Sequence, residues 1–296
     1  MTLTAAPAST LTELAGRLRA SELSPREATQ AYLDRIGALN PTVNAYIHVA
    51  AESALAAADA AGRVPAAERG PLWGVPLGAW TISPHFGPAR NPWDTDRICG
   101  GSSGGSGCAM AADLAAGTLG SDTAGSIRIP ACFGGVTGIR PSTGRVSNGG
   151  SVPVSATFDT IGPIARTAED CALLLRTIAG HDPERDPSTF DLPVPDYVAG
   201  LAGGVKGLRI GVVAQRLESG INPAVAAAVR EAIEELRRLG AVVEEVRPQF
   251  TETAGVVHQL VMLPEAAQNH AQWLRDCPEK YGDDVRARLL AGVFMP

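Results

Sequence analysis

The chain has 296 residues, which is enough for one large α/β domain or two smaller ones with a substantial core. A net charge of −6 and a charged fraction of 19% provide no basic surface for nucleic acid or anionic lipid. The five cysteines are scattered without a C-x-x-C pair, which is typical of reduced thiols in the cytoplasm. No stretch is long and apolar enough for a membrane span, and the first residues lack the pattern of a signal peptide.

Residues 1–62 read as a helical N-terminal region. Thr10 and Ser24 each stand three positions before a glutamate, which is the capping box that begins a helix. We expect the second of these helices to stop at Asn40-Pro41, because a residue before proline is pushed out of the helical region. The short apolar run 45–49, with its β-branched residues, predicts a strand.

Residues 63–180 form the expected core region of the chain, which begins with a proline-rich irregular stretch. Two glycine-rich turns come next along the chain. After them, the apolar runs 134–139 and 161–165 read as strands. Thr167 then begins a capped helix that we expect to end at Gly180.

Residues 181–205 read as a polar, proline-rich linker, and 206–296 as a partial C-terminal half. Within that half, a β-run at 208–213, a helix beginning at Asn222-Pro223 and a strand at 241–246 form a βαβ unit. We therefore expect a single α/β domain over 1–296, with a mixed, mainly parallel sheet covered by helices on both faces. The closing sequence RARLLAGVFMP has no cap or polar tail, which favours a truncated C-terminus.

The most informative stretch is GGSSGGSG, followed by GSDTAGS, which place Ser102 and Ser126 in two separate glycine-rich turns. Glycines in such runs serve backbone geometry and close approach to a ligand rather than packing. A serine nucleophile needs a base within hydrogen-bond reach. No lysine or histidine lies between the two serines.

Two other motifs compete for the first of these turns. Gly101-Ser102-Ser103-Gly104-Gly105 satisfies G-x-S-x-G and would name Ser103 as the nucleophile of an α/β-hydrolase elbow. Almost no strand precedes it, which argues against that motif. A phosphate-binding loop is disfavoured because no G-K-[ST] follows the glycines.

Taken with NPWD before them and GIRPSTGRVS and IGPIART after them, the two turns closely resemble the amidase signature family of amide hydrolases. The resemblance implies a Ser–cis-Ser–Lys triad, in which Ser126 matches the acylated nucleophile and Ser102 the serine held by a cis peptide. It assigns the oxyanion hole to the backbone N–H groups of four consecutive residues: Thr123, Ala124, Gly125 and Ser126. Asp122 and Arg128 are expected to brace this turn, and Ser103 to bond locally within the glycine loop.

The sequence departs from the family at the lysine. Gly74-Val75-Pro76 is followed by Trp80 where the family's lysine would stand, and NPWD comes several dozen residues early. The chain's lysines, Lys206 and Lys280, match no catalytic position, and His85 is a weak substitute base. We therefore expect an internal deletion that removed the base, with weak or absent turnover.

By resemblance the function is hydrolysis of a carbon–nitrogen amide bond through a Ser126 acyl-enzyme, on a small-molecule amide and without cofactor or metal. One alternative is a non-catalytic remnant that acts as a binding or scaffold protein. Another is the glutamine amidotransferase component of the same family, which would need partner chains. The sequence leaves open whether the chain forms a homodimer.

Overall fold

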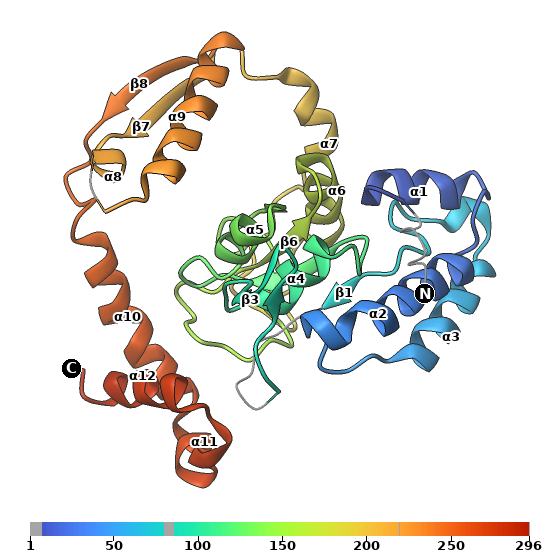
Figure 1. The fold of residues 1–296 in the computed structure, drawn as a ribbon, viewed down its shortest axis with the longest axis horizontal. Coiled ribbons are helices and arrows are strands. Elements are labelled where there is room, and N and C mark those ends of the chain that lie inside the picture. The colour runs from blue at the N-terminus through green and yellow to red at the C-terminus, as the bar shows by residue number, and fades with distance from the viewer. Residues whose placement is uncertain (1–7, 80–85, 219, 296) are drawn as a thin grey trace. The chain divides into compact units, whose positions relative to one another are not determined.

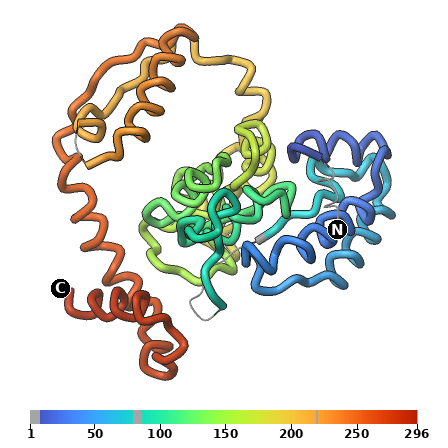
Figure 2. The backbone as a smooth tube through the Cα atoms, viewed as in Figure 1, coloured from blue at the N-terminus to red at the C-terminus, as the bar shows by residue number. Residues whose placement is uncertain are grey.

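The computed structural model describes residues 8–79, 86–218 and 220–295. The chain divides into two compact units: unit 1 is Met1–Val198 with Met262–Pro296, and unit 2 is Ala199–Val261. The chain passes from unit 1 into unit 2 after Val198 and returns to unit 1 at Met262 (Figure 2). The expectation of one domain with a linker at 181–205 stays a prediction.

Helices begin and end the chain, and short strands are interspersed with further helices between them (Figure 1). The helices are α1 (Leu11–Arg19), α2 (Pro25–Val43), α3 (Ala51–Gly62), α4 (Gly104–Ala111), α5 (Arg128–Gly134), α6 (Ala168–Ile178), α7 (Tyr197–Gly200), α8 (Gln215–Glu218), α9 (Pro223–Arg238), α10 (Ala254–Asn269), α11 (Ala271–Asp276) and α12 (Asp283–Val293). The strands are β1 (Gly78–Ala79), β2 (Arg90–Asn91), β3 (Asp94–Ile98), β4 (Thr118–Ser121), β5 (Thr137–Gly138), β6 (Ile161–Ala165), β7 (Arg209–Val213) and β8 (Val242–Val246). No helix among the described residues is both long and apolar enough to cross a membrane.

Of the two predicted capping boxes, the one at Ser24 forms in full, whereas at Thr10 the Glu13 carboxylate bonds Ser9 instead. The Thr10 hydroxyl accepts from the Glu13 N–H at 3.0 Å. Ser24 and Glu27 form a full capping box, in which each side chain accepts from the other's backbone N–H. Such a cap typically contributes about 1 kcal/mol, so these contacts fix where α1 and α2 begin.

The predicted end of α2 at Asn40-Pro41 is wrong, because the helix continues to Val43 with Pro41 inside it. Asn44 then ends the helix in the left-handed conformation, with φ 50°, and donates its N–H to the Asn40 carbonyl at 2.8 Å. The extra turn buries Val43 in an apolar cluster with Cys99 and Cys108. Tertiary burial thus outweighs the local preference of the residue before proline.

The predicted strand at 45–49 is also wrong, because this segment is irregular. The Asn40 amide donates to the Tyr46 carbonyl at 2.8 Å and accepts from the Tyr46 N–H at 2.8 Å. The Tyr46 hydroxyl donates to the Leu114 carbonyl at 3.1 Å. A single side chain therefore occupies the backbone groups that a neighbouring strand would otherwise have paired.

The central sheet of unit 1 has the order β1-β4-β6-β5 and is mixed, as predicted. Among its described strands, β1 and β4 pair in parallel, whereas β6 runs antiparallel to both β4 and β5. The antiparallel share is larger than the mainly parallel sheet we expected. The chain between β1 and β4 contains α4, which supplies the crossover that parallel pairing needs, and β6 returns in the opposite sense.

Helices cover both faces of this sheet, as predicted. Ile164 and Ala165 are consecutive in β6, so their side chains point to opposite faces. Ile164 packs with Ile127 and with Met110 of α4, whereas Ala165 packs with a cluster from α1, α2 and α6. One apolar layer therefore lies on each side of β6.

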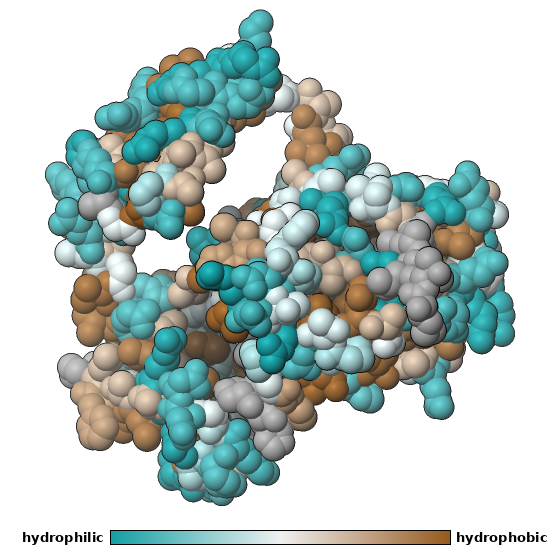
Figure 3. Space-filling view, viewed as in Figure 1, coloured by the Kyte–Doolittle hydropathy of each residue, from teal (hydrophilic) through white to brown (hydrophobic). Residues whose placement is uncertain are grey.

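Unit 2 contains the predicted βαβ unit, in which β7 and β8 pair in parallel with Arg209 opposite Val242. The Asn222 side chain caps α9 by accepting from the Ala224 N–H at 2.9 Å. Gly240, with φ 92°, turns the chain from α9 into β8. The visible face of unit 2 is largely hydrophilic (Figure 3).

Candidate active site

The two serine turns are joined by a backbone hydrogen bond. The Ser103 N–H donates to the Ser126 carbonyl at 3.1 Å. The Gly101–Ser102 peptide bond is cis, as the resemblance implies for this serine. Ser102 is exposed and Ser126 is half-buried. The fold therefore brings both predicted serines into one site at the starts of α4 and α5.

Ser103 and Ser106 fix the first turn to the adjacent strand β4. The Ser103 hydroxyl donates to the Ser121 carbonyl and accepts from the Ser121 N–H, both at 3.1 Å. The Ser106 hydroxyl donates to the Leu119 carbonyl at 2.8 Å. A Cβ at Gly120 would lie only 2.7 Å from the Ser103 hydroxyl, so glycine is required there. Ser103 is buried, and its hydroxyl both donates to and accepts from β4. It is therefore not available to act as a nucleophile.

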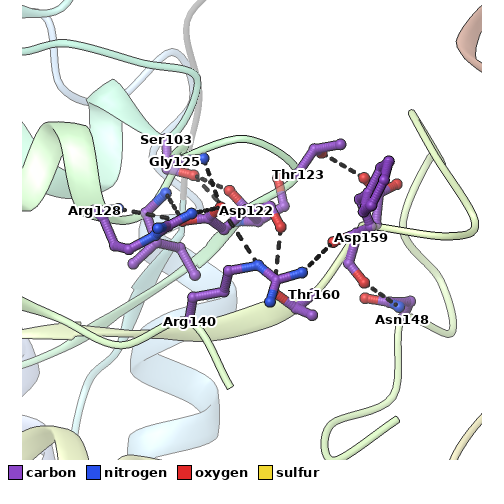
Figure 4. A network of polar contacts seen from close by, with 12 residues as sticks. Ser103, Asp122, Thr123, Gly125, Arg128, Arg140, Asn148, Asp159 and Thr160 are labelled. Carbon is purple, nitrogen blue, oxygen red and sulfur yellow. Dashed lines mark hydrogen bonds and ion pairs between the residues drawn. The ribbon is translucent and has the colours of Figure 1, made fainter. Parts of the chain in front are cut away.

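Asp122 organises the second turn from a fully buried position (Figure 4). Its carboxylate accepts from the N–H groups of Gly125 at 2.7 Å and Ile127 at 3.2 Å. Arg128 adds two guanidinium bonds of 3.0 Å, and Arg140 lies 3.7 Å away. Burial alone would raise the pKa of Asp122, but the Arg128 and backbone N–H bonds hold it below its usual value. The carboxylate is therefore ionised and braces the loop.

The backbone N–H groups of this turn are not equivalent. Gly125 gives its N–H to Asp122, so the four-residue oxyanion hole that the resemblance assigns does not have Gly125 available in this structure. Among the described residues, no hydrogen bond engages the N–H groups of Ala124 and Ser126. The N–H groups of Ala124 and Ser126 are therefore open to a bound ligand.

Neither the Ser102 nor the Ser126 hydroxyl bonds to any described residue, so no base contacts them there. Lys206 lies in unit 2, and Lys280 in the short helix Pro278–Lys280. Trp80 and His85 lie outside the described residues. Within the described part of the chain, no group of three or more metal-ligating side chains gathers to hold an ion.

Four residues of the network around Asp122 were not predicted from the sequence (Figure 4). They are Arg140, Asn148, Asp159 and Thr160. The Thr123 hydroxyl donates to the Asp159 carboxylate, and Thr160 exchanges backbone bonds with Asp122. Asp159 and Thr160 stand in TFDT, directly before the apolar run 161–165. The sequence signal that could have identified them is an aspartate directly before the apolar run 161–165, next to the segment IGPIART on which the resemblance rests.

Comparison with known proteins places this geometry in a family. The Amidase family model matches residues 27–79 and 77–292. Two sequence relatives, from Geobacter metallireducens and Moorella thermoacetica, are each named as one component of a glutamyl-tRNA(Gln) amidotransferase. They are 36% and 41% identical to this chain, covering 96% and 95% of it and 74% and 73% of their own lengths.

Solved structures agree with these sequence relatives. A peptide amidase from Stenotrophomonas maltophilia has 27% identity and a TM-score of 0.81, over 96% of this chain and 76% of its own. The corresponding glutamyl-tRNA(Gln) amidotransferase component from Thermotoga maritima has 28% identity and a TM-score of 0.74, over 96% and 70%. The chain belongs to the amidase signature family of amide carbon–nitrogen hydrolases and amidotransferases.

The same comparison confirms that the chain lacks an internal stretch. The two matched segments of the family model meet at residues 77–79, directly before Trp80. The alignment with the Geobacter relative spans 358 positions, which exceeds the 296 residues of this chain. Its relatives therefore carry residues that have no counterpart here, and the break falls where the sequence predicts the loss of the lysine.

Proposed function

We propose that this protein binds a small-molecule amide and acylates Ser126 slowly, because it retains the nucleophile and oxyanion donors of an amidase without the base. The observation that carries this proposal is the turn around Ser126. Asp122 holds that turn, and no described residue bonds the Ser126 hydroxyl or the N–H groups of Ala124 and Ser126.

In the proposed reaction, the Ser126 oxygen bonds to the amide carbon while the N–H groups of Ala124 and Ser126 take up the charge on the carbonyl oxygen. The carbon–nitrogen bond then breaks as the leaving nitrogen takes a proton from solvent, and water adds to the acyl-enzyme, which releases the acid and restores the Ser126 hydroxyl. Ser102 passes the Ser126 proton to solvent instead of to a lysine. An unactivated serine is a weak nucleophile, so acylation is slow.

Covalent labelling with a fluorophosphonate tests the nucleophile. We expect slow labelling of the wild-type protein at Ser126 and none in Ser126→Ala. Ser53→Ala, a change at an exposed serine of α3, is the matched control and should label like the wild type. Rapid, stoichiometric labelling would show that a base remains, and no labelling at all would favour a non-catalytic remnant.

Chemical rescue tests the missing base. Ser102 is exposed, so a small amine from solution can reach it. We expect methylamine to accelerate the labelling of Ser126 at pH values where the free amine is present. No acceleration in the wild type, or equal acceleration in Ser102→Ala, would show that proton transfer through Ser102 does not limit the reaction.

A second candidate function is glutamine hydrolysis that supplies ammonia to a partner. The observation in its favour is that both sequence relatives described above are named as components of a glutamyl-tRNA(Gln) amidotransferase. Ammonia release from glutamine, measured beside release from simple linear amides, separates the two. Preference for glutamine would favour the amidotransferase function.

A further inference from the structure

The loop of residues 153–159, here called the clamp loop, is tied to the Ser126 turn through one carboxylate. Asp159 is 8% exposed and accepts from the Thr123 hydroxyl. It also accepts from the N–H groups of Val154 at 2.7 Å and Ser155 at 2.9 Å. Asp159 thus joins the start of the clamp loop to the residue before Ala124, one of the two oxyanion donors.

A second carboxylate holds the clamp loop from the side of α10. Glu265 accepts from the hydroxyls of Ser155 and Thr157 and from the Thr157 N–H at 3.2 Å. Burial would raise the pKa of Glu265, but these hydrogen bonds lower it, so the Glu265 carboxylate that holds the loop is charged. On the next turn of α10, the Asn269 amide donates to the Val154 carbonyl at 3.2 Å.

The two carboxylates meet at Ser155, which is fully buried. Its N–H donates to Asp159 and its hydroxyl donates to Glu265, so neither bond can shift without straining the other. Charge-assisted hydrogen bonds of this kind are about twice as strong as neutral ones. A continuous series of bonds therefore runs from α10 to the turn that carries the oxyanion donors.

We propose that Glu265 is a positioning residue for the Ser126 turn and acts through Ser155, Asp159 and Thr123. Its effect on the reactivity of Ser126 rests on the proposed function, whereas its effect on the order of the turn does not. The alternative is that Glu265 only anchors α10 to the clamp loop. In that case the loss of the Glu265 charge would leave the Ser126 turn unchanged, because Asp122 already braces it.

Hydrogen exchange distinguishes these alternatives. Glu265→Gln keeps the side chain's size and removes its charge. We expect exchange of the Gly125 and Ile127 N–H groups, both of which Asp122 accepts, to become about tenfold faster, the scale of one weakened hydrogen bond to a charged group. Glu252→Gln, at an exposed glutamate just before α10, is the matched control and should leave exchange unchanged. Faster exchange confined to α10 and the clamp loop would overturn the proposal.

A double-mutant cycle tests the path. Thr123→Val removes the hydroxyl at the last link and leaves Glu265 in place. In that background, Glu265→Gln should no longer accelerate exchange of the Gly125 and Ile127 N–H groups; an undiminished effect would rule out the path through Thr123. If Glu265→Gln does not fold, Thr157→Val, at an exposed threonine, weakens the same clamp and takes its place.

The labelling rate of Ser126 provides the second readout. We expect Glu265→Gln to slow fluorophosphonate labelling several-fold, with Glu252→Gln unchanged. Absence of labelling in the wild type would contradict the proposed function, and the exchange experiment would still decide the role of Glu265. Normal labelling and normal exchange in Glu265→Gln would reject the positioning role alone.

Discussion

Replacing Asp122 with asparagine should lower the free energy of unfolding by about 1–3 kcal/mol, the usual cost of leaving a buried polar group without its partner. The substitution keeps the size of the side chain, so a cavity does not contribute. It removes the charge that faces Arg128 and Arg140 and replaces one accepting oxygen with an N–H₂ group.

The magnitude follows from what each Asp122 oxygen accepts. One oxygen takes the Gly125 N–H at 2.7 Å and an Arg128 Nη2 bond at 3.0 Å. The other takes the Ile127 N–H at 3.2 Å, the Arg128 backbone N–H at 3.4 Å and the Arg128 Nε bond at 3.0 Å. Whichever oxygen becomes N–H₂, a buried backbone N–H, of Gly125 or of Ile127, then faces a donor, whereas the half-exposed Arg128 guanidinium can bond to water instead. Each buried group left without a partner costs about 1–3 kcal/mol, which gives the same range.

Urea unfolding at neutral pH measures this loss. Asp113→Asn is the matched control, because Asp113 forms a half-exposed ion pair with Arg166 and such pairs contribute at most about 1 kcal/mol. A loss for Asp122→Asn below about 1 kcal/mol, or equal to that of the control, would refute the bracing role of Asp122.

The same pair of proteins should show a pH dependence of known sign. The pKa of Asp122 is lower in the folded protein than its usual value. The stabilisation is therefore fully present above the unfolded pKa of about 4 and is lost as the pH falls through the folded pKa. The stability difference between wild type and Asp122→Asn should shrink in acid. A difference that grows in acid would contradict the direction of the shift.

Three further changes test the fold. Ser24→Ala should cost about 1 kcal/mol in thermal unfolding because it removes the cap of α2, and no change would mean the capping box is dispensable. Gly162→Ala should cost about 1–3 kcal/mol or more, since a Cβ there would lie 2.2 Å from the Ile139 carbonyl; wild-type stability would exclude that close approach. In thiol labelling of the native protein, exposed Cys132 should react and Cys171 should not, because burial raises the pKa of Cys171 to about 12. Equal rates would contradict the burial of Cys171.

Local chemistry predicted the parts of the fold that are decided locally. The capping residues Thr10, Ser24 and Thr167 begin helices where expected, because a side-chain oxygen meets the first free N–H groups within three residues. The βαβ unit of unit 2 was predicted for the same reason, from the cap at Asn222 and the glycine at 240.

The predictions that failed concern segments whose structure depends on contacts beyond their immediate neighbours in the sequence. The end of α2 and the irregular segment 45–49 depend on the burial of Val43 and on the Asn40 side chain, whose partner is six residues away. In the site, the resemblance located Ser102 and Ser126, whereas Asp159 is defined by bonds that cross the fold. The use of the Gly125 N–H by Asp122 could not be read from residue types, because it depends on the path of the backbone.

The backbone bond from Ser103 to Ser126 and the bonds of Asp122 have a consequence for evolution. These contacts keep the protein folded whether or not it turns over a substrate. Mutations that damage the two turns would therefore be removed by selection for stability alone, even after a catalytic base is lost. The sequence motifs that identify an amidase can thus persist after its activity is lost. Their presence in a genome is therefore evidence of a folded protein as much as of an active enzyme.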